Sequence, residues 1–421
     1  MQLPEEFIRE TRRIMGDTRF ERYLKAFEEE PPVSIRLNPL KTEGMTVCDG
    51  ERVPWCRHAY YLKQRPQFTF DPMLHAGCYY VQEAASMFLD QVLRQWLPQH
   101  PVAMLDMCAA PGGKSTLART ALPQGSTLYA NEPMRQRANI LMENMQKWGY
   151  GQCIVTNCYP KDYRKNKMMF DVILCDVPCS GEGMFRKDEA TIKEWSPQQV
   201  DKCQRLQREI VNEAWECLKD GGLLVYSTCT LNTKENEENV RWLLAEHEAE
   251  ALTVETKPEW NITGSLLEGF TAPVYRFIPG ITRGEGLFMA AIRKQGCSQS
   301  HASRTMAPLL YDGTPKPTAK GRDMIPSQAM ALSTACNLSA YPTAELNYAE
   351  AVSYLRGEAL ALPSGVPQGF TLVTFNGKPL GFVKNIGTRA NNLYPKEWKI
   401  KTTHIPDNYE TILRTAEQDS D

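Results

Sequence analysis

The stretch that most constrains the fold is residues 105–115, LDMCAAPGGKS. The apolar run before it, residues 102–105 (VAML), has the length and composition of a short buried strand. Small residues then turn the chain, and residues 114–122 have the composition of a helix. A strand, a small-residue turn and a helix N-terminus form the first unit of a nucleotide-binding α/β sheet. Small side chains let a ligand lie against the backbone, where the N–H groups of the first helical turn can face it.

The nearest alternative is a phosphate-binding P-loop, because Gly113, Lys114 and Ser115 end the stretch as such a loop ends. That motif requires a glycine five residues before its second glycine, and Cys108 stands there instead. Alanines and a proline also make a weaker nest of backbone donors for phosphates. The stretch therefore favours an adenosyl ligand over a nucleoside triphosphate.

Strand and helix patterns alternate beyond this stretch. Further strand patterns lie at residues 126–131, 153–156, 170–175, 223–226 and 286–292, the last compatible with an antiparallel strand, and residues 232–247 have a helical pattern. The alternation predicts an α/β fold with a doubly wound, mostly parallel, Rossmann-like sheet. Ligands of such sheets bind beyond the carboxyl ends of the strands. The polar residues at the predicted ends are Asp106, Glu132, Asn157, Asp176 and Cys229.

Composition narrows the function classes. Charge is balanced at 48 basic and 50 acidic residues, so a nucleic-acid partner would have to be held by local patches. Thirteen cysteines without CxxC pairs, and six histidines without ligand spacing, favour a reducing compartment and argue against a disulfide framework or a metal site. The first residues lack the pattern of a signal peptide, and no apolar run approaches bilayer length. We expect a cytoplasmic, monomeric protein with no membrane contact.

Two flanking regions carry local basic patches. In residues 52–70, basic residues alternate with aromatic ones, which suits RNA and equally suits an ordinary α+β domain with a solvated basic face. Residues 369–401 predict a small β-rich unit, with strands at 370–375, 380–383 and 398–401. Within residues 371–401, six basic residues stand against one acidic residue, and we favour an RNA contact there.

Two cysteines stand directly after predicted strand ends, Cys179 in DVPCSG (residues 176–181) and Cys229 in STCT (residues 227–230). Most cysteines are small buried hydrophobic residues, but these two lie where the sheet presents its site. Neither has a convincing histidine partner in the sequence, which disfavours a protease-like pair. A thiol suits nucleophilic addition to carbon 6 of cytosine, after which carbon 5 can attack an activated methyl group. A base must then remove the carbon 5 proton so that the thiol can leave.

These motifs resemble those of the Sun/nucleolar-protein family of RNA cytosine-5 methyltransferases. The resemblance lies in residues 106–115, 176–183 (DVPCSGEG) and 226–230 (YSTCT), and in the N-terminal stretches 34–40 (SIRLNPL) and 81–85 (VQEAA). It covers residues 1–295. Residues 389–399 (RANNLYPKEWK) resemble the bacterial branch that acts on small-subunit ribosomal RNA and carries a PUA-like RNA-binding unit.

The resemblance implies a domain order. We expect an N-terminal α+β RNA-binding domain in residues 1–90 and a Rossmann-like methyltransferase domain in residues 91–295. A linker in residues 296–325 and a C-terminal helical and PUA-like RNA-binding region in residues 326–421 would follow.

The resemblance also implies S-adenosylmethionine as the methyl donor. Glu132 would take both ribose hydroxyls, Arg137 would support it, and Asp176 would also border the cofactor. Where the family usually has an aspartate near the adenine, this chain has Asn157. The loop that would wrap the cofactor consists of Cys108, Ala109, Ala110, Pro111, Gly112, Gly113 and Lys114.

By the same resemblance, the chain would methylate carbon 5 of a cytosine in RNA, with 16S ribosomal RNA as the expected substrate, through a covalent cysteine adduct. Cys229 would be the nucleophile and Cys179 would assist product release. Asp176 would hydrogen-bond the cytosine, and Lys114 would hold Asp176 and lower the pKa of Cys229. The target base would have to be flipped out or single-stranded.

Three alternatives remain open at this point: a tRNA cytosine-5 methyltransferase, a non-catalytic RNA-binding factor of ribosome assembly, and a small-molecule methyltransferase. Both cysteines and Asp176 argue against an inert factor. A small-molecule enzyme would need neither Cys229 nor flanking RNA-binding domains.

Overall fold

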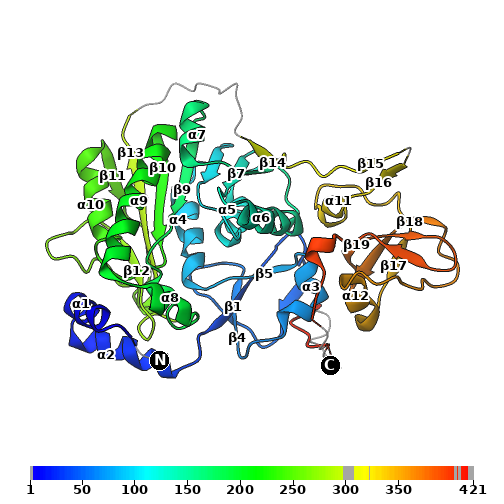
Figure 1. The fold of residues 1–421 in the computed structure, drawn as a ribbon, viewed down its shortest axis with the longest axis horizontal. Helices are drawn as coiled ribbons and strands as arrows, with labels where there is room; N and C mark the ends of the chain where they lie inside the picture. Colours follow the sequence, from blue (N-terminus) through cyan, green and yellow to red (C-terminus); the bar gives the residue numbers. More distant parts are fainter. Residues whose placement is uncertain (1–2, 297–307, 322, 403–404, 406–408, 416–421) are drawn as a thin grey trace.

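A computed structural model describes residues 3–296, 308–321, 323–402, 405 and 409–415 (Figure 1). Its centre is a nine-stranded sheet with the order β11-β13-β10-β9-β6-β7-β8-β14, in which β12 also pairs with β13. The five parallel strands are β6 (Ala103–Asp106), β7 (Thr127–Asn131), β8 (Cys153–Thr156), β9 (Phe170–Asp176) and β10 (Leu218–Thr228). The antiparallel strands are β11 (Ala249–Leu252), β12 (Tyr275–Phe277), β13 (Leu287–Lys294) and β14 (Leu309–Tyr311). The doubly wound, mostly parallel sheet is confirmed.

Helices cover both faces of this sheet, and the alternation of side chains along β9 shows how. Val172 and Leu174 join one core cluster, together with apolar residues of α4, α5 and α6. Ile173 and Cys175 point the other way and join a second cluster with residues of α7, α9 and α10. These helices are α4 (Leu89–Trp96), α5 (Gly113–Ala121), α6 (Arg135–Trp148), α7 (Pro160–Lys165), α9 (Pro197–Cys217) and α10 (Glu237–Glu246).

The N-terminal region is a smaller α+β unit. Its sheet has the order β3-β4-β1-β5, from the strands β1 (Val33–Leu37), β3 (Glu51–Arg52), β4 (Ala59–Leu62) and β5 (Tyr79–Val81). A two-stranded sheet joins β2 (Met45–Val47) to β21 (Leu413–Thr415) near the other end of the chain. The helical segments are α1 (Glu5–Met15), α2 (Asp17–Lys25), η1 (Ala26–Glu28), η2 (Phe68–Phe70), α3 (Pro72–His75) and η3 (Ala85–Phe88). Phe7 and Tyr23 of the first two helices pack with Phe185, near the short helices η4 (Glu182–Met184) and α8 (Glu189–Glu194).

The C-terminal region holds a second small sheet, of order β17-β18-β19-β20. Its elements are α11 (Gln328–Leu332), β17 (Thr343–Glu345), α12 (Tyr348–Leu355), β18 (Gly369–Phe375), β19 (Lys378–Asn385), β20 (Ala390–Asn392) and η6 (Lys396–Trp398). The predicted strand at residues 398–401 is wrong. The Trp398 N–H donates to the Pro395 carbonyl at 3.1 Å, which closes a tight turn there, and β20 is the third strand of the hairpin series.

The stretch expected to be a linker, residues 296–325, contains strands. Leu309–Tyr311 forms β14, which pairs antiparallel with β8 and extends the central sheet beyond residue 295. Leu310 and Tyr311 pack against the core below, so this strand covers an edge that β8 would otherwise expose. A hairpin of β15 (Thr318–Lys320) and β16 (Asp323–Ile325) follows, and residues 297–307 lie outside the described part.

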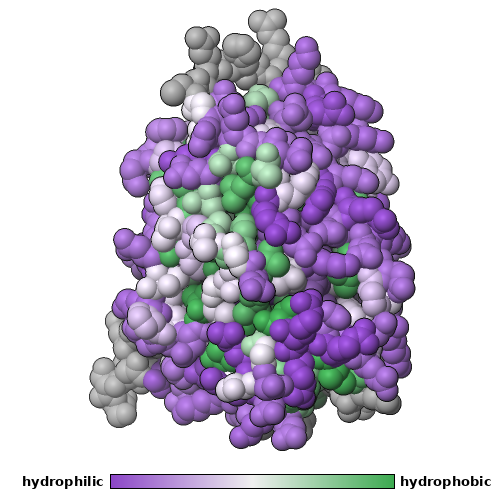
Figure 2. All heavy atoms as spheres, turned by 90° about the vertical axis from the view of Figure 1, so that its left-hand side faces the viewer, coloured by the Kyte–Doolittle hydropathy of each residue, from purple (hydrophilic) through white to green (hydrophobic). Residues whose placement is uncertain are grey.

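Figure 2 shows the side of the molecule on which α10, β11 and the N-terminal helices lie, which is the left-hand side of Figure 1. It is largely hydrophilic around a broken band of hydrophobic residues, as expected where the apolar sides of sheet and helices face inward. None of the described helices combines the length and the apolar character needed to cross a bilayer.

Arg36 of β1 joins the N-terminal sheet to the central one. The side chain is 2% exposed, and its Nε donates to Gln82 Oε1 at 2.9 Å. Its Nη2 donates to Thr116 Oγ1 of α5 at 2.6 Å, and its guanidinium lies 4.4 Å from the ring centroid of Trp148. The motif at residues 34–40 therefore supports the first turn of α5, which follows the small-residue loop.

We expect Arg36→Met to lower the free energy of unfolding by about 2–3 kcal/mol, because Gln82 and Thr116 would lose a charged donor inside the protein. The measurement is urea unfolding followed by circular dichroism. Arg13→Met is the matched control, since Arg13 is exposed and pairs with Glu10 at 3.0 Å, and it should change the free energy by less than about 0.5 kcal/mol. Equal effects for the two variants would contradict the interdomain role of Arg36.

Candidate active site

The chain order of the parallel strands reverses at β6, which has β7 and β8 on one side and β9 and β10 on the other. In open α/β sheets the crevice at such a point binds ligands at the carboxyl ends of the strands. The loop from β6 to α5 lies there. Gly112, the residue before α5, has a φ of 113°, which favours glycine, and a Cβ on it would stand 3.3 Å from Leu141 Cδ1.

Helix α6 holds this loop from the side. Asn144 Nδ2 donates to the Pro111 carbonyl at 2.8 Å, and Arg137 Nη2 donates to the Ala110 carbonyl at 3.1 Å. At the base of the loop, the Ser115 hydroxyl donates to Asp106 Oδ2 at 2.6 Å. Burial raises the pKa of Asp106 to about 7. Asp106 therefore fixes the first turn of α5.

Glu132 follows β7 and is buried, with 2% of the residue exposed. Its Oε1 accepts the N–H of Met134 at 2.9 Å, and its Oε2 lies 3.3 Å from Arg137 Nη1. Asn157, after β8, donates its amide to the backbone carbonyls of Glu132 and Pro133 at 2.7 and 2.9 Å. The amide nitrogen of Asn157 thus holds the segment that carries Glu132.

The side chains of Lys114 and Asp176 meet in the crevice at β6, where the order of the parallel strands reverses. Lys114 Nζ lies 2.9 Å from Asp176 Oδ2, and both side chains are at least partly buried. Burial lowers the pKa of Lys114, but the Asp176 carboxylate outweighs burial, so that the pKa ends above its ordinary value. The lysine therefore carries its charge at neutral pH and stands between the loop that follows β6 and the end of β9.

The loops after β9 and β10 bring Cys179 and Cys229 together, with 3.1 Å between the two sulfur atoms. The contact with Cys179 lowers the pKa of the Cys229 thiol, and the Lys114 charge lowers it further against burial and Asp176. The same contact, helped by burial, raises the pKa of Cys179. Cys229 is thus the thiol of the pair that more readily becomes a thiolate.

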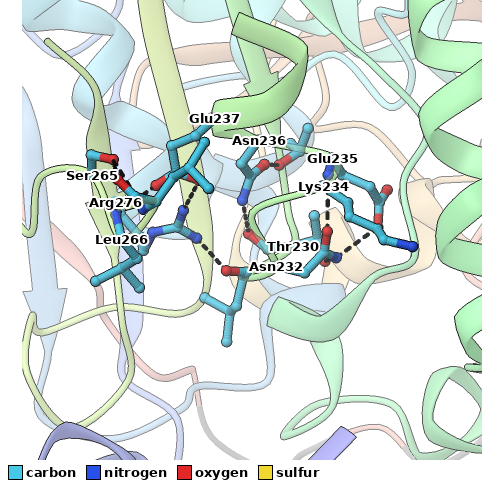
Figure 3. A network of polar contacts seen from close by, with 12 residues as sticks. Thr230, Asn232, Lys234, Glu235, Asn236, Glu237, Ser265, Leu266 and Arg276 are labelled. Atoms are coloured by element: carbon cyan, nitrogen blue, oxygen red, sulfur yellow. Dashed lines mark hydrogen bonds and ion pairs between the residues drawn. The ribbon is translucent and has the colours of Figure 1, made fainter. Parts of the chain in front are cut away.

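Residues 229–236 form a loop. The sequence pattern predicts a helix from residue 232, but α10 begins only at Glu237. A buried ion pair fixes its far end: Glu237 and Arg276 form a salt bridge with both side chains 0% exposed, and Arg276 also donates to the Leu231 carbonyl (Figure 3). Glu237 Oε1 accepts the N–H of Leu266 at 2.8 Å.

Sequence reasoning missed the polar residues that brace the two cysteine loops. They are Ser180, Glu182, Gln207, Thr230, Asn232 and Glu235. Glu182 follows Cys179 by three residues, and Glu235 follows Cys229 by six. This short spacing from the two site cysteines is a signal in the sequence that could have found both glutamates. The predicted residues Cys229, Cys179, Lys114 and Asp176 lie together. Glu132 and Asn157 follow the neighbouring strands β7 and β8, and Arg137 reaches Glu132 from α6.

Three family models match consecutive parts of the chain. The model described as 16S rRNA methyltransferase RsmB/F matches residues 94–293. The N-terminal domain of 16S rRNA methyltransferase RsmF matches residues 3–84, and the methyltransferase RsmF PUA domain matches residues 341–400. The chain belongs to the RsmB/F family. This membership confirms the resemblance to the bacterial branch of the Sun family and the C-terminal PUA domain.

Curated relatives of this RsmB/F family member span nearly its whole length. It is 28% identical to the ribosomal RNA small subunit methyltransferase F of Salmonella heidelberg (strain SL476), over 94% of this chain and 96% of that protein. The protein of the same description from Klebsiella pneumoniae (strain 342) is also 28% identical, with the same coverage.

Solved structures show the same fold. A methyltransferase homolog protein from Pyrococcus horikoshii is 27% identical with a TM-score of 0.56, over 69% of this chain and 100% of that chain. NSun6 from Pyrococcus horikoshii, solved with SFG, has 20% identity and a TM-score of 0.57, over 70% of this chain and 99% of that chain. The RsmB/F methyltransferases are dependent on S-adenosylmethionine, so the predicted methyl donor is confirmed.

Glu132→Ala is expected to weaken binding of S-adenosylmethionine by about 1–3 kcal/mol, through loss of charged hydrogen bonds to the ribose. Isothermal titration calorimetry measures the affinity. Glu143→Ala is the control, because Glu143 also lies on α6 but pairs with Lys147 at 2.6 Å. Unchanged affinity in Glu132→Ala would refute the assignment of Glu132 to the ribose.

Lys114→Met should raise the pKa of the Cys229 thiol, because it removes the nearby positive charge and leaves Asp176 unpaired. Alkylation of Cys229 by iodoacetamide, read by peptide mass spectrometry across pH, should therefore slow at neutral pH. Lys219→Met is the matched control, since Lys219 pairs with Asp171 at 2.7 Å near the opposite ends of β10 and β9. The same alkylation profile in Lys114→Met and the wild type would contradict the electrostatic role of Lys114.

Proposed function

We propose that this protein transfers the methyl group of S-adenosylmethionine to carbon 5 of a cytosine in 16S ribosomal RNA, through a covalent adduct with Cys229. The observation that carries the proposal is the pair of thiols, 3.1 Å apart, next to the Lys114–Asp176 ion pair. The descriptions of the family models and relatives support the substrate. A methyltransferase acting on a nucleophilic nitrogen or oxygen has no need of two adjacent thiols.

The chemistry assigns one thiol to attack. Carbon 5 of cytosine is a poor nucleophile. Addition of the Cys229 thiolate at carbon 6 turns carbon 5 into the nucleophilic carbon of an enamine, which can attack the methyl group. The lowered pKa of Cys229 favours the thiolate. Asp176, held by Lys114 at 2.9 Å, is assigned to the cytosine edge, where a carboxylate can accept from the exocyclic amine.

The second thiol is assigned to product release. After methyl transfer, a base removes the carbon 5 proton, the electron pair of that C–H bond re-forms the carbon 5–carbon 6 double bond, and the sulfur of Cys229 leaves as a thiolate. Cys179 is the side chain placed beside that sulfur, at 3.1 Å. Its raised pKa keeps it a thiol in the resting protein, so that Cys229 is the nucleophile and Cys179 is the helper.

The donor set of the neighbouring strand ends fits S-adenosylmethionine. Cys108 to Lys114 offer a loop of small side chains, and Glu132 offers a buried carboxylate for the ribose hydroxyls. Asn157 donates its amide nitrogen to the backbone, which leaves its Oδ1 as the atom for the adenine amino group. When bound, S-adenosylmethionine supplies an electrophilic methyl group.

RNA would be held by both flanking domains. The PUA domain carries the basic residues of 371–401, among which Arg389, Lys396 and Lys401 are exposed. Such cations bind phosphates without regard to sequence, so they would fix the RNA while the crevice takes the flipped base.

The two cysteines should separate in a covalent trapping experiment. Cys229→Ala should abolish methylation and leave no protein–RNA adduct. Cys179→Ala should allow attack and methyl transfer but stall release, giving a denaturant-resistant protein–RNA band that depends on S-adenosylmethionine.

Cys336→Ala is the control, because Cys336 is a partly exposed cysteine of the C-terminal region and should behave as the wild type. A stalled band in Cys229→Ala, together with its absence in Cys179→Ala, would mean that the two roles are reversed. No band and no methylated cytosine in any active preparation would overturn the covalent mechanism.

A further inference from the structure

Two buried glutamates lie behind the cysteines and have no step in the mechanism above. Glu182 lies in η4, which follows Cys179, and Glu235 lies in the loop that follows Cys229. They are 2% and 0% exposed. Burying two carboxylates this close together costs free energy. The pKa of Glu235 is raised to about 7, first because the group is buried and second because of the charge of Glu182. Their contacts show what offsets this cost.

Each carboxylate accepts backbone N–H groups from the loop that carries the other cysteine. Glu182 Oε2 accepts the N–H groups of Leu231 and Asn232, both at 2.9 Å. Glu235 Oε2 accepts the N–H of Ser180 at 3.0 Å. The arrangement is reciprocal, because each cysteine loop provides a carboxylate and each provides donors to the opposite one. Hydrogen bonds to ionised groups are the short, strong ones.

Side chains complete the connection. The Asn232 amide nitrogen lies 3.0 Å from Glu182 Oε1 and 2.8 Å from Glu235 Oε1, so it bridges both carboxylates (Figure 3 shows Asn232 beside Glu235). The hydroxyls of Ser180 and Thr230, the residues directly after the two cysteines, lie 2.9 Å apart. The backbone of both loops is therefore fixed immediately next to the sulfur atoms.

We propose that Glu182 and Glu235 form a reciprocal clamp that sets the separation of the Cys179 and Cys229 thiols, which makes both glutamates positioning residues for methyl transfer. The inference rests on the proposed function, because that chemistry requires one thiol to bond the base while the other stands beside it. Misplacing a reacting group by about 1 Å costs about 100-fold in rate. Two loops after neighbouring strands have no covalent connection at this point, so polar contacts must hold them.

Disulfide closure measures the separation of the thiols without RNA or cofactor. Diamide takes two electrons and two protons from Cys179 and Cys229, forming the sulfur–sulfur bond and a hydrazine. We expect closure in Glu182→Gln and in Glu235→Gln to be about tenfold slower than in the wild type, because each amide turns N–H groups toward the donors of the opposite loop. Glu238→Gln, three residues further along the chain, should close at the wild-type rate.

Methylation by the full-length variants is then measured with S-adenosylmethionine and 16S ribosomal RNA. For Glu182→Gln and Glu235→Gln, kcat should fall about 100-fold while the KM for S-adenosylmethionine stays the same, because the cofactor loop and Glu132 are untouched. A purely structural defect would instead lower the fraction of active protein, which titration with S-adenosylmethionine reveals.

The outcomes separate the two proposals. If the wild type methylates no cytosine, the proposed function fails. If the wild type is active and the glutamate variants match it in either assay, the clamp fails and the function stands. Should a glutamate variant not fold, Asn232→Ala removes the shared amide and leaves both carboxylates. It should slow closure and methylation together, and wild-type rates in Asn232→Ala would overturn the clamp.

Discussion

The ion pair of Lys114 and Asp176 is the contact on which the site depends, because it spans the point where the order of the central sheet reverses. Lys114 lies in the first turn of α5 and Asp176 ends β9, so the pair joins the β6–α5 side of the crevice to the side that holds the thiols. Charges in such a partly buried place interact more strongly than in water, and removal of one leaves the other unpaired. The same lysine charge lowers the pKa of Cys229. Under the proposed function, cofactor binding and thiol activation would therefore share one residue.

Helix α6 connects this crevice to the rest of the molecule. Arg137 in its first turn and Asn144 further along the helix hold the loop between β6 and α5. Its last turn is held by the N-terminal domain, because Lys41 donates to the Lys147 carbonyl at 2.7 Å. The following Gly149 carbonyl accepts the N–H of Thr334 from the C-terminal region at 2.9 Å. The two flanking domains thus contact the C-terminal end of the helix that also holds the loop before α5. RNA held by those domains would be presented to a crevice that they also support.

The sequence predicts the central sheet and most of the site, because buried parallel strands are short apolar runs that end at polar residues. Lys114, Asp176, Cys179 and Cys229 follow from that rule and from the family motifs. Strand β14 could not be predicted, since three residues in a stretch rich in serine, threonine and proline have no periodic pattern, and the free edge of β8 makes them a strand. The contacts of Glu182 and Glu235 depend on β9 and β10 being neighbours, which no local pattern shows. The break before α10 arises for the same reason, because residues 229–236 bond to the opposite loop instead of forming helical turns.

Under the proposed function, two adjacent thiols serve carbon methylation of cytosine in RNA. The most direct test supplies the purified protein with unmodified 16S ribosomal RNA and S-adenosylmethionine labelled in its methyl group. The RNA is then digested, and the labelled nucleoside is identified by chromatography and mass spectrometry. We expect the label in 5-methylcytidine. Label in a nucleoside methylated on nitrogen or on the ribose, with none in 5-methylcytidine, would contradict the proposed function.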